Sequence, residues 1–236
     1  RQSEVTARMR TILVDWIIEV HYKYHLTPAT LWTTVNIMDR YLEKHDIARG
    51  RLQLVGITAL FLACKFEEIH SPQVNDCVYL TDNAYKKEEI LAMEASILQT
   101  LDYQLMVPTG LTFLTRYLNR IKATERVRLM ASYAAERNLQ ELEVFQYSPR
   151  IYAAACVYIA LYAVHVDQIP QVKVWTSELE EEANLKECDI LPCAKALMVH
   201  LREIPQASTR RKLDSARKKY STAQTQFIGE YSYPNL

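Results

Sequence analysis

Apolar residues recur at helical spacing along most of the 236-residue chain, and no convincing alternation of apolar and polar positions predicts a strand. Thr27-Pro28 and Ser148-Pro149 each pair a favoured N-cap residue with a proline suited to the first helical turn. We therefore expect two sets of helices, the first at about 6–25, 28–45, 51–67, 73–80 and 86–101, and the second at about 111–121, 125–141, 149–164, 174–183 and 187–202. A basic helical tail is expected near 210–220.

Each set contains one helix that is apolar on nearly all sides, at 52–66 and at 151–164. A helix of this kind must be wrapped by other helices, since it has no polar face to turn toward water. The economical architecture is an all-α fold of two tandem five-helix bundles joined near Pro108. The expected domains are residues 1–107, residues 108–207 and a basic C-terminal tail over 208–236.

Four charged residues fall on or beside helix faces that should be buried. On helical wheels Arg10, Asp39, Lys65 and Glu94 each lie among apolar neighbours. A buried charge is costly unless it is paired, so two pairs of opposite sign are the economical solution. The sequence leaves the partners open: Arg10 with Asp39 would join the first two helices, and Lys65 with Glu94 would join the third and fifth.

The two pairs differ in their surroundings along the chain. For Arg10 and Asp39 a structural ion pair in the core is the favoured interpretation. Lys65 stands at a helix end, and Phe66, Glu67, Glu68 and Ile69 follow it at once. A lysine in that position could instead donate hydrogen bonds to the backbone of a partner protein.

The first helix carries an apolar stripe, formed at i, i+3, i+4 and i+7 by Met9, Ile12, Leu13 and Trp16. On the helical wheel Glu19 lies beside the stripe, and Asp15 lies next to Glu19. An apolar patch edged by acid suits a ligand that has a basic residue close to an aliphatic one. The pattern alone equally describes ordinary core packing.

The composition excludes several functional classes. The chain has 28 basic and 28 acidic residues, so it offers no broad positive field for nucleic acid or anionic lipid. Only 4 glycines occur, and there is no P-loop, G-x-G-x-x-G or G-x-S-x-G sequence, which leaves no candidate nucleotide site or nucleophile. The longest uncharged stretch, 151–164, is too short to span a membrane. We expect no enzymatic activity, cofactor, nucleic-acid partner or membrane contact.

The cysteines, histidines and C-terminal basic residues each have a structural interpretation. The 5 cysteines lack C-x-x-C spacing and no signal peptide is visible, which favours a reducing compartment. His21 and His25 stand at i, i+4 without the glutamate of H-E-x-x-H, and Cys188 and Cys193 lack zinc-ligand spacing, so no metal site is expected. A solvated final helix is the favoured interpretation of the basic patch formed by Arg210, Arg211, Lys212, Arg217, Lys218 and Lys219. The start at Arg1 suggests part of a longer protein.

Several spaced segments resemble one family in the right order. The segments are MRTILVDWIIEV at 9–20, NIMDRYL at 36–42, LQLVGITALFLACKFEEIHSP at 52–72, YLTD at 79–82 and MEASILQTLDYQL at 93–105. Together they resemble the cyclin box, and the second half resembles the C-terminal cyclin box more loosely through Ser148-Pro149 and its alanine-rich central helix. The overall pattern is most similar to the mitotic cyclins of the A and B types.

The resemblance implies a regulatory subunit of a cyclin-dependent kinase, acting in mitosis and located in the nucleus and cytoplasm. In that family the first bundle docks on the small lobe of the kinase and holds its mobile PSTAIRE helix. The resemblance places Lys65 and Glu94 at the centre of this contact. The rest of the implied surface consists of Leu62, Phe66, Glu67, Glu68, Ile69, Leu98, Tyr103 and Leu105.

The resemblance also assigns a role to the apolar stripe. In cyclins it is the docking groove for Arg-x-Leu segments of substrates and inhibitors, to which Leu52 and Gln53 of the third helix contribute. Glu19 would meet the arginine of the segment, and the groove would accept the leucine. An alternative is a cyclin-fold transcription module that contacts DNA or the basal transcription machinery, as in the general initiation factor B family. The zero net charge and the missing zinc cysteines count against it.

Overall fold

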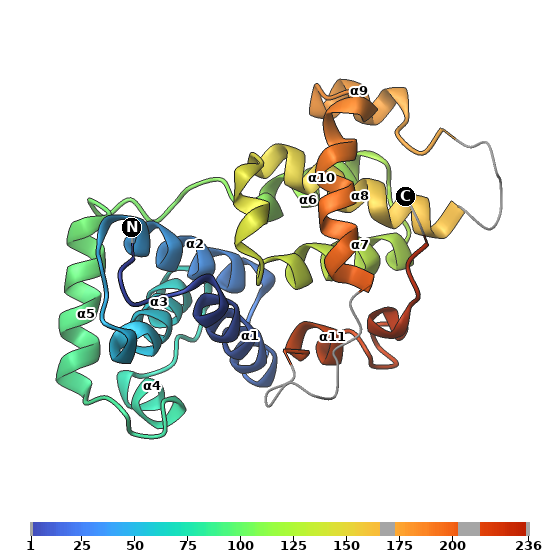
Figure 1. Ribbon diagram of the computed structural model, residues 1–236. Helices are drawn as coiled ribbons and strands as arrows, with labels where there is room; N and C mark the ends of the chain where they lie inside the picture. The colour runs from blue at the N-terminus through green and yellow to red at the C-terminus, as the bar shows by residue number, and fades with distance from the viewer. Residues whose placement is uncertain (1, 166–172, 203–212, 235–236) are drawn as a thin grey trace. The chain divides into compact units, whose positions relative to one another are not determined.

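The computed structural model describes residues 2–165, 173–202 and 213–234 (Figure 1). Within these ranges all regular structure is helical and no strand occurs. The chain divides into two compact units, Arg1–Thr109 and Gly110–Leu236. These observations confirm the prediction of an all-α fold built from two tandem helical bundles. Among the described residues, no helix has both the length and the apolarity needed to cross a bilayer.

The first unit is built around one central helix, α3 (Figure 1). It contains α1 (Ala7–Lys23), α2 (Pro28–Lys44), the short 3-10 helix η1 (Arg49–Arg51), α3 (Leu52–Glu67), α4 (Val74–Leu80) and α5 (Lys87–Thr100). The central helix packs against α1, α2, α4 and α5. Nearly every side chain from Leu52 to Cys64 is buried, as the all-round apolar pattern predicted.

Local sequence determines where several of these helices begin. The Thr6 hydroxyl accepts a hydrogen bond from the Met9 amide at 3.3 Å and so caps α1. In α4 the amide of the N-cap Gln73 donates to Asp76 Oδ2 at 2.7 Å, which is one half of a capping box. Pro28 occupies the first turn of α2, where its missing N–H costs nothing.

The second unit repeats the plan around α8. It contains α6 (Gly110–Arg120), α7 (Glu125–Asn138), η2 (Leu142–Gln146), α8 (Pro149–His165), α9 (Ser177–Ala183), α10 (Glu187–Arg202), α11 (Ser215–Lys219) and η3 (Ile228–Glu230). The central α8 packs against α6, α7 and α10 and is buried from Tyr152 through Ala160. Two helices of this unit are shorter than expected. The helix expected at 125–141 ends at Asn138, and the helix expected at 174–183 begins after its N-cap, Thr176.

The end of the chain differs from the expected solvated tail. Residues 213–234 pack on α7 within the second unit, and Ala216, Tyr220, Ile228 and Tyr233 are buried there. These apolar side chains outweigh the basic composition, which suggested a free helix. The basic residues Arg210, Arg211 and Lys212 lie outside the described residues.

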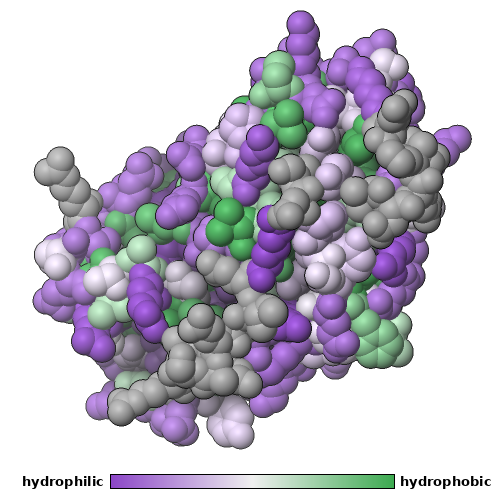
Figure 2. All heavy atoms as spheres, turned by 45° about the vertical axis from the view of Figure 1, so that its right-hand side comes forward, coloured by the Kyte–Doolittle hydropathy of each residue, from purple (hydrophilic) through white to green (hydrophobic). Residues whose placement is uncertain are grey.

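On the face drawn in Figure 2 hydrophobic residues form small patches between hydrophilic ones.

Candidate partner-binding surface

Lys65 and Glu94 form an ion pair between the last turn of α3 and the middle of α5. The Glu94 side chain is 13% exposed, whereas 42% of the Lys65 side chain is exposed. The Lys65 ammonium also lies 4.4 Å from the centre of the Phe61 ring, which adds a cation–π contact. The pair therefore sits at the surface, with a positive donor held in place and still accessible to another molecule.

Large apolar side chains are exposed in the segments beside this pair. Ile69 is 94% exposed, Tyr103 69% and Phe66 45%. Leu98 and Leu105 are half-buried, and Leu62 is buried in the core. Exposed apolar residues gathered around a fixed charge are typical of an interaction site. We call this set the α3–α5 surface: Leu62, Lys65, Phe66, Glu67, Glu68, Ile69, Glu94, Leu98, Tyr103 and Leu105.

Two of the three glutamates of the α3–α5 surface, Glu67 and Glu68, are anchored to the start of α2. Glu68 Oε1 accepts a hydrogen bond from the Thr27 amide at 2.7 Å and another from the Thr30 hydroxyl. Glu67 Oε1 accepts one from the Thr33 hydroxyl at 2.7 Å. Burial acts to raise the pKa of Glu68, but the hydrogen bonds from Thr30 and Thr27 outweigh it and lower the pKa. The sequence analysis did not identify the hydrogen bonds from these threonines. The one available signal was the spacing of Thr27, Thr30 and Thr33 at i, i+3 and i+6.

Arg10 and Asp39 lie together, and both nitrogens of one guanidinium edge are used. Arg10 Nε donates to Asp39 Oδ1 at 2.7 Å, and Arg10 Nη2 donates to Asp39 Oδ2 at 2.8 Å. The Arg10 side chain is only 3% exposed. This pair joins α1 to α2 in the interior, so its arrangement suits a structural role.

The apolar stripe of α1 is partly exposed. Met9, Ile12 and Trp16 are half-buried and Glu19 is exposed, whereas Leu13 is buried. Leu13 touches α3 so closely that a Cβ added to Gly56 would lie 2.7 Å from Leu13 Cδ1. On α3, Leu52 is buried and Gln53 is half-buried one turn before Gly56. We call the set Met9, Ile12, Leu13, Trp16, Glu19, Leu52 and Gln53 the α1 stripe.

The second unit contains a buried carboxylate that the sequence pattern did not reveal. Glu136 of α7 is 2% exposed, and it accepts hydrogen bonds from Lys219 Nζ at 2.6 Å and from the Tyr220 hydroxyl at 3.0 Å. The same wheel argument that found Arg10 could have found Glu136, since Leu129 and Tyr133, at i−7 and i−3, lie beside it on the wheel and are apolar. The pairing fastens the C-terminal segment to α7.

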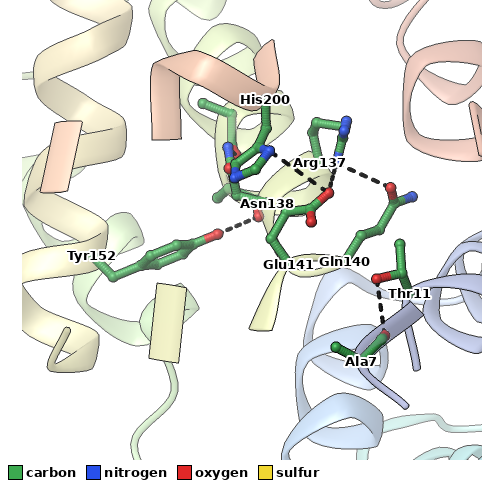
Figure 3. Close-up of polar contacts among 10 residues, drawn as sticks. Ala7, Thr11, Arg137, Asn138, Gln140, Glu141, Tyr152 and His200 are labelled. Carbon is green, nitrogen blue, oxygen red and sulfur yellow. Dashed lines mark hydrogen bonds and ion pairs between the residues drawn. The ribbon is translucent and has the colours of Figure 1, made fainter. Parts of the chain in front are cut away.

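A further polar cluster lies at the end of α7 (Figure 3). Arg137 Nη1 donates to Glu141 Oε1 at 2.7 Å and to Gln140 Oε1 at 3.1 Å, and His200 Nδ1 lies 4.0 Å from Glu141 Oε1. The buried Tyr152 hydroxyl donates to the Ala135 carbonyl at 2.6 Å. These contacts surround the C-terminal end of α7.

The cysteines of the core are unsuited to nucleophilic chemistry. Burial raises the pKa of Cys64, Cys77 and Cys193 to about 12 in each case, so their thiols stay protonated at neutral pH. In the part of the chain that the structure describes, no three His, Cys, Asp or Glu side chains come together as a metal site would require.

Two family models match nearly the whole chain, the cyclin N-terminal domain over residues 1–106 and the cyclin C-terminal domain over residues 108–232. The chain is 38% identical over 221 residues to Cyclin-B2-1 of Oryza sativa subsp. japonica, which covers 94% of this chain and 50% of the relative. It is 39% identical over 230 residues to G2/mitotic-specific cyclin-1 of Medicago sativa subsp. varia, covering 98% of this chain and 52% of the relative. The chain thus spans about half the length of these curated relatives.

Solved structures share the fold. The X-ray structure of a viral cyclin from herpesvirus saimiri matches with a TM-score of 0.72 and 23% identity, over 84% of this chain and 86% of that chain. A chain of the yeast RNA Pol II CTD kinase CTDK-1 complex matches with a TM-score of 0.62 and 14% identity, over 98% of this chain and 78% of that chain. Since both helical units match cyclin domain models in order, the chain belongs to the cyclin family.

Proposed function

We propose that this cyclin is the activating subunit of a cyclin-dependent kinase that drives mitosis. The observation that carries the proposal is the accessible Lys65–Glu94 pair among exposed apolar residues of the α3–α5 surface. Relatives that share more than a third of its residues have names that describe mitotic cyclins. One chain of similar fold comes from a kinase complex. The partner we propose is a kinase with a PSTAIRE-type helix.

The chemistry of the α3–α5 surface suits the capture of a helix from another protein. Glu94 orients the Lys65 ammonium, which can donate hydrogen bonds to backbone carbonyls at a helix C-terminus. Burying an exposed residue such as Ile69 contributes about 1.5–3 kcal/mol. A kinase helix that fits this surface in only one position is held there, and the population of active kinase rises. Phosphoryl transfer itself stays on the kinase.

Alanine substitution of either member of the pair tests the proposal. We expect Lys65→Ala and Glu94→Ala to weaken binding of a PSTAIRE-type kinase at least tenfold and to reduce kinase activation accordingly, because the central donor is lost or misplaced. The matched control is Arg120→Ala, which breaks an exposed ion pair with Glu178 in the second unit, where the two side chains are each 46% exposed. Full activation by both pair variants would reject the assigned surface.

We further propose that the α1 stripe recruits substrates with Arg-x-Leu segments. The half-buried Trp16 provides apolar area and the exposed Glu19 provides the charge for the arginine. We expect Trp16→Ala to slow phosphorylation of a substrate that carries the segment and to spare a short peptide that lacks it. The matched control is Phe145→Ala, an exposed aromatic residue in the second unit. An equal loss for both substrates would reject this role.

A further inference from the structure

The last turn of α2 is fastened to the end of α5. Arg40 Nη1 donates to the Gln104 carbonyl at 2.8 Å, and Lys44 Nζ donates to the Thr100 carbonyl at 3.0 Å. His45 Nε2 and the Thr100 hydroxyl are 2.8 Å apart. Lys44 therefore meets a carbonyl at the negative end of α5, where the last carbonyls lack partners within the helix, and Arg40 meets a carbonyl in the segment that follows α5.

The segment after α5 needs this support. Asp102 and Tyr103 both have positive φ values, 50° and 59°, a conformation that is strained for residues other than glycine. Tyr103 is 69% exposed, so few side-chain contacts within the protein fix its position. Its position is fixed through backbone groups instead. The Tyr103 amide donates to the Leu98 carbonyl at 2.9 Å, and the Arg40 side chain donates to the carbonyl of the next residue, Gln104.

The opposite end of α2 fastens the other end of the same surface. Thr27, Thr30 and Thr33 hold the carboxylates of Glu68 and Glu67, which directly follow Lys65 and Phe66. The 17 residues of α2 span about 25 Å. One helix with its N-cap thus contacts two separate parts of the α3–α5 surface, although none of its own residues belongs to that surface.

We propose that α2 is the positioning element of the kinase-binding surface, with Arg40 and Thr30 as its positioning residues. Arg40 keeps the strained turn that presents Tyr103 in its binding conformation, and Thr30 keeps Glu68 and the preceding Phe66 in theirs. The kinase then meets a preorganised surface and spends less binding free energy on ordering it. This inference rests on the proposed function of the α3–α5 surface.

Binding of a purified PSTAIRE-type kinase to the full chain provides the test. We expect Arg40→Gln to weaken binding about fivefold to tenfold, while Arg40→Lys, which keeps a cation for the Gln104 carbonyl, stays within about twofold of the wild type. The matched control is Arg128→Gln in the second unit, because Arg128 donates in the same way to the Ala123 carbonyl at 3.1 Å and the Leu118 carbonyl at 3.3 Å, at the end of α6. We expect the control to bind within about twofold of the wild type.

A second readout separates positioning from general stability. In the free chain, Arg40→Gln should speed hydrogen exchange at the Tyr103 amide while leaving the amides of central α3 protected. Thr30→Val should weaken kinase binding in the same way, and Thr30→Ser, which keeps the hydroxyl donor to Glu68, should restore it. Unchanged binding by both Arg40→Gln and Thr30→Val, or an equal loss in Arg128→Gln, overturns the inference. If Lys65→Ala also binds like the wild type, the proposed function itself has failed.

Discussion

At the scale of single residues, the buried ion pair between Arg10 and Asp39 shows how much depends on keeping both partners. The guanidinium is 3% exposed and Asp39 accepts two of its hydrogen bonds. We expect Asp39→Ala to lower the free energy of unfolding by about 3 kcal/mol, because a buried charge then lacks its counter-ion. Urea unfolding measures this loss. The double variant Arg10→Met with Asp39→Leu should lose clearly less, and an equal loss would contradict the account.

Glu68 gives the first unit a pH dependence. Burial acts to raise its pKa, yet the hydrogen bonds from Thr30 and Thr27 lower it. A carboxyl whose pKa falls on folding stabilises the fold above its unfolded pKa, about 4.3, and this stabilisation is lost as the pH falls through the folded value. We expect Glu68→Gln to cost about 1 kcal/mol at neutral pH and progressively less below pH 4. Urea unfolding at several pH values tests this, with the exposed Glu43→Gln as a control that changes little.

The rule of opposite charges on apolar faces located Arg10, Asp39, Lys65 and Glu94 without assigning their partners, and the structure pairs Arg10 with Asp39 and Lys65 with Glu94. The rule works because a charged residue is easily recognised in the sequence when its neighbours on the helix face are apolar. It could not locate the anchors of Glu67 and Glu68, since a hydroxyl group on a helix has no unambiguous partner in the sequence. Those contacts depend on how α2 and α3 pack.

At the scale of elements, the close contact between α1 and α3 depends on Gly56. A Cβ there would lie 2.7 Å from Leu13 Cδ1, so Leu13 must move if any other residue replaces this glycine. We expect Gly56→Ala to cost about 1–2 kcal/mol of stability, because overpacking outweighs the better helix propensity of alanine. It should also weaken binding of an Arg-x-Leu peptide to the α1 stripe, measured by fluorescence anisotropy.

The control for this substitution is Gly50→Ala, where a new Cβ meets nothing within 4 Å. That variant should keep both its stability and its peptide affinity close to the wild type. If Gly56→Ala also keeps its peptide affinity, the α1 stripe does not depend on the packing of Leu13 against α3.

Helices with a cap or a proline at their start could be predicted from the sequence, and so could the short α4, expected at 73–80 and found at Val74–Leu80. The 3-10 helices η1, η2 and η3 were not predicted. The starts of α2 and α8 follow from Thr27-Pro28 and Ser148-Pro149. The end of α7 could not be predicted, because the helical pattern continues past Asn138, where the structure ends the helix. No glycine or proline follows Asn138 before Pro149, so the sequence carries no local stop signal at this point.

At the scale of the whole molecule, the C-terminal segment is an integral part of the second unit. Gly229 shows how tightly it folds, since a Cβ there would collide with the Arg217 carbonyl oxygen and would lie 2.6 Å from Ser221 Oγ. The Gly229 amide also donates to the Tyr220 carbonyl at 2.9 Å. The composition of the segment indicated a solvated tail, because its many basic residues favour exposure to water. The sequence did not show that Tyr220 and Tyr233 would be buried.

The buried Glu136 makes stability and kinase binding separable in this chain. We expect Lys219→Met to lower the stability of the second unit by about 3 kcal/mol, because it removes the ammonium that lies 2.6 Å from a carboxylate only 2–3% exposed. Hydrogen exchange should speed up in α7 and α11, while α3 and the affinity for the kinase stay unchanged. Lys218→Met, at a neighbouring lysine that is 71% exposed, serves as the control. Faster exchange in α3 would show that the two units do not unfold independently.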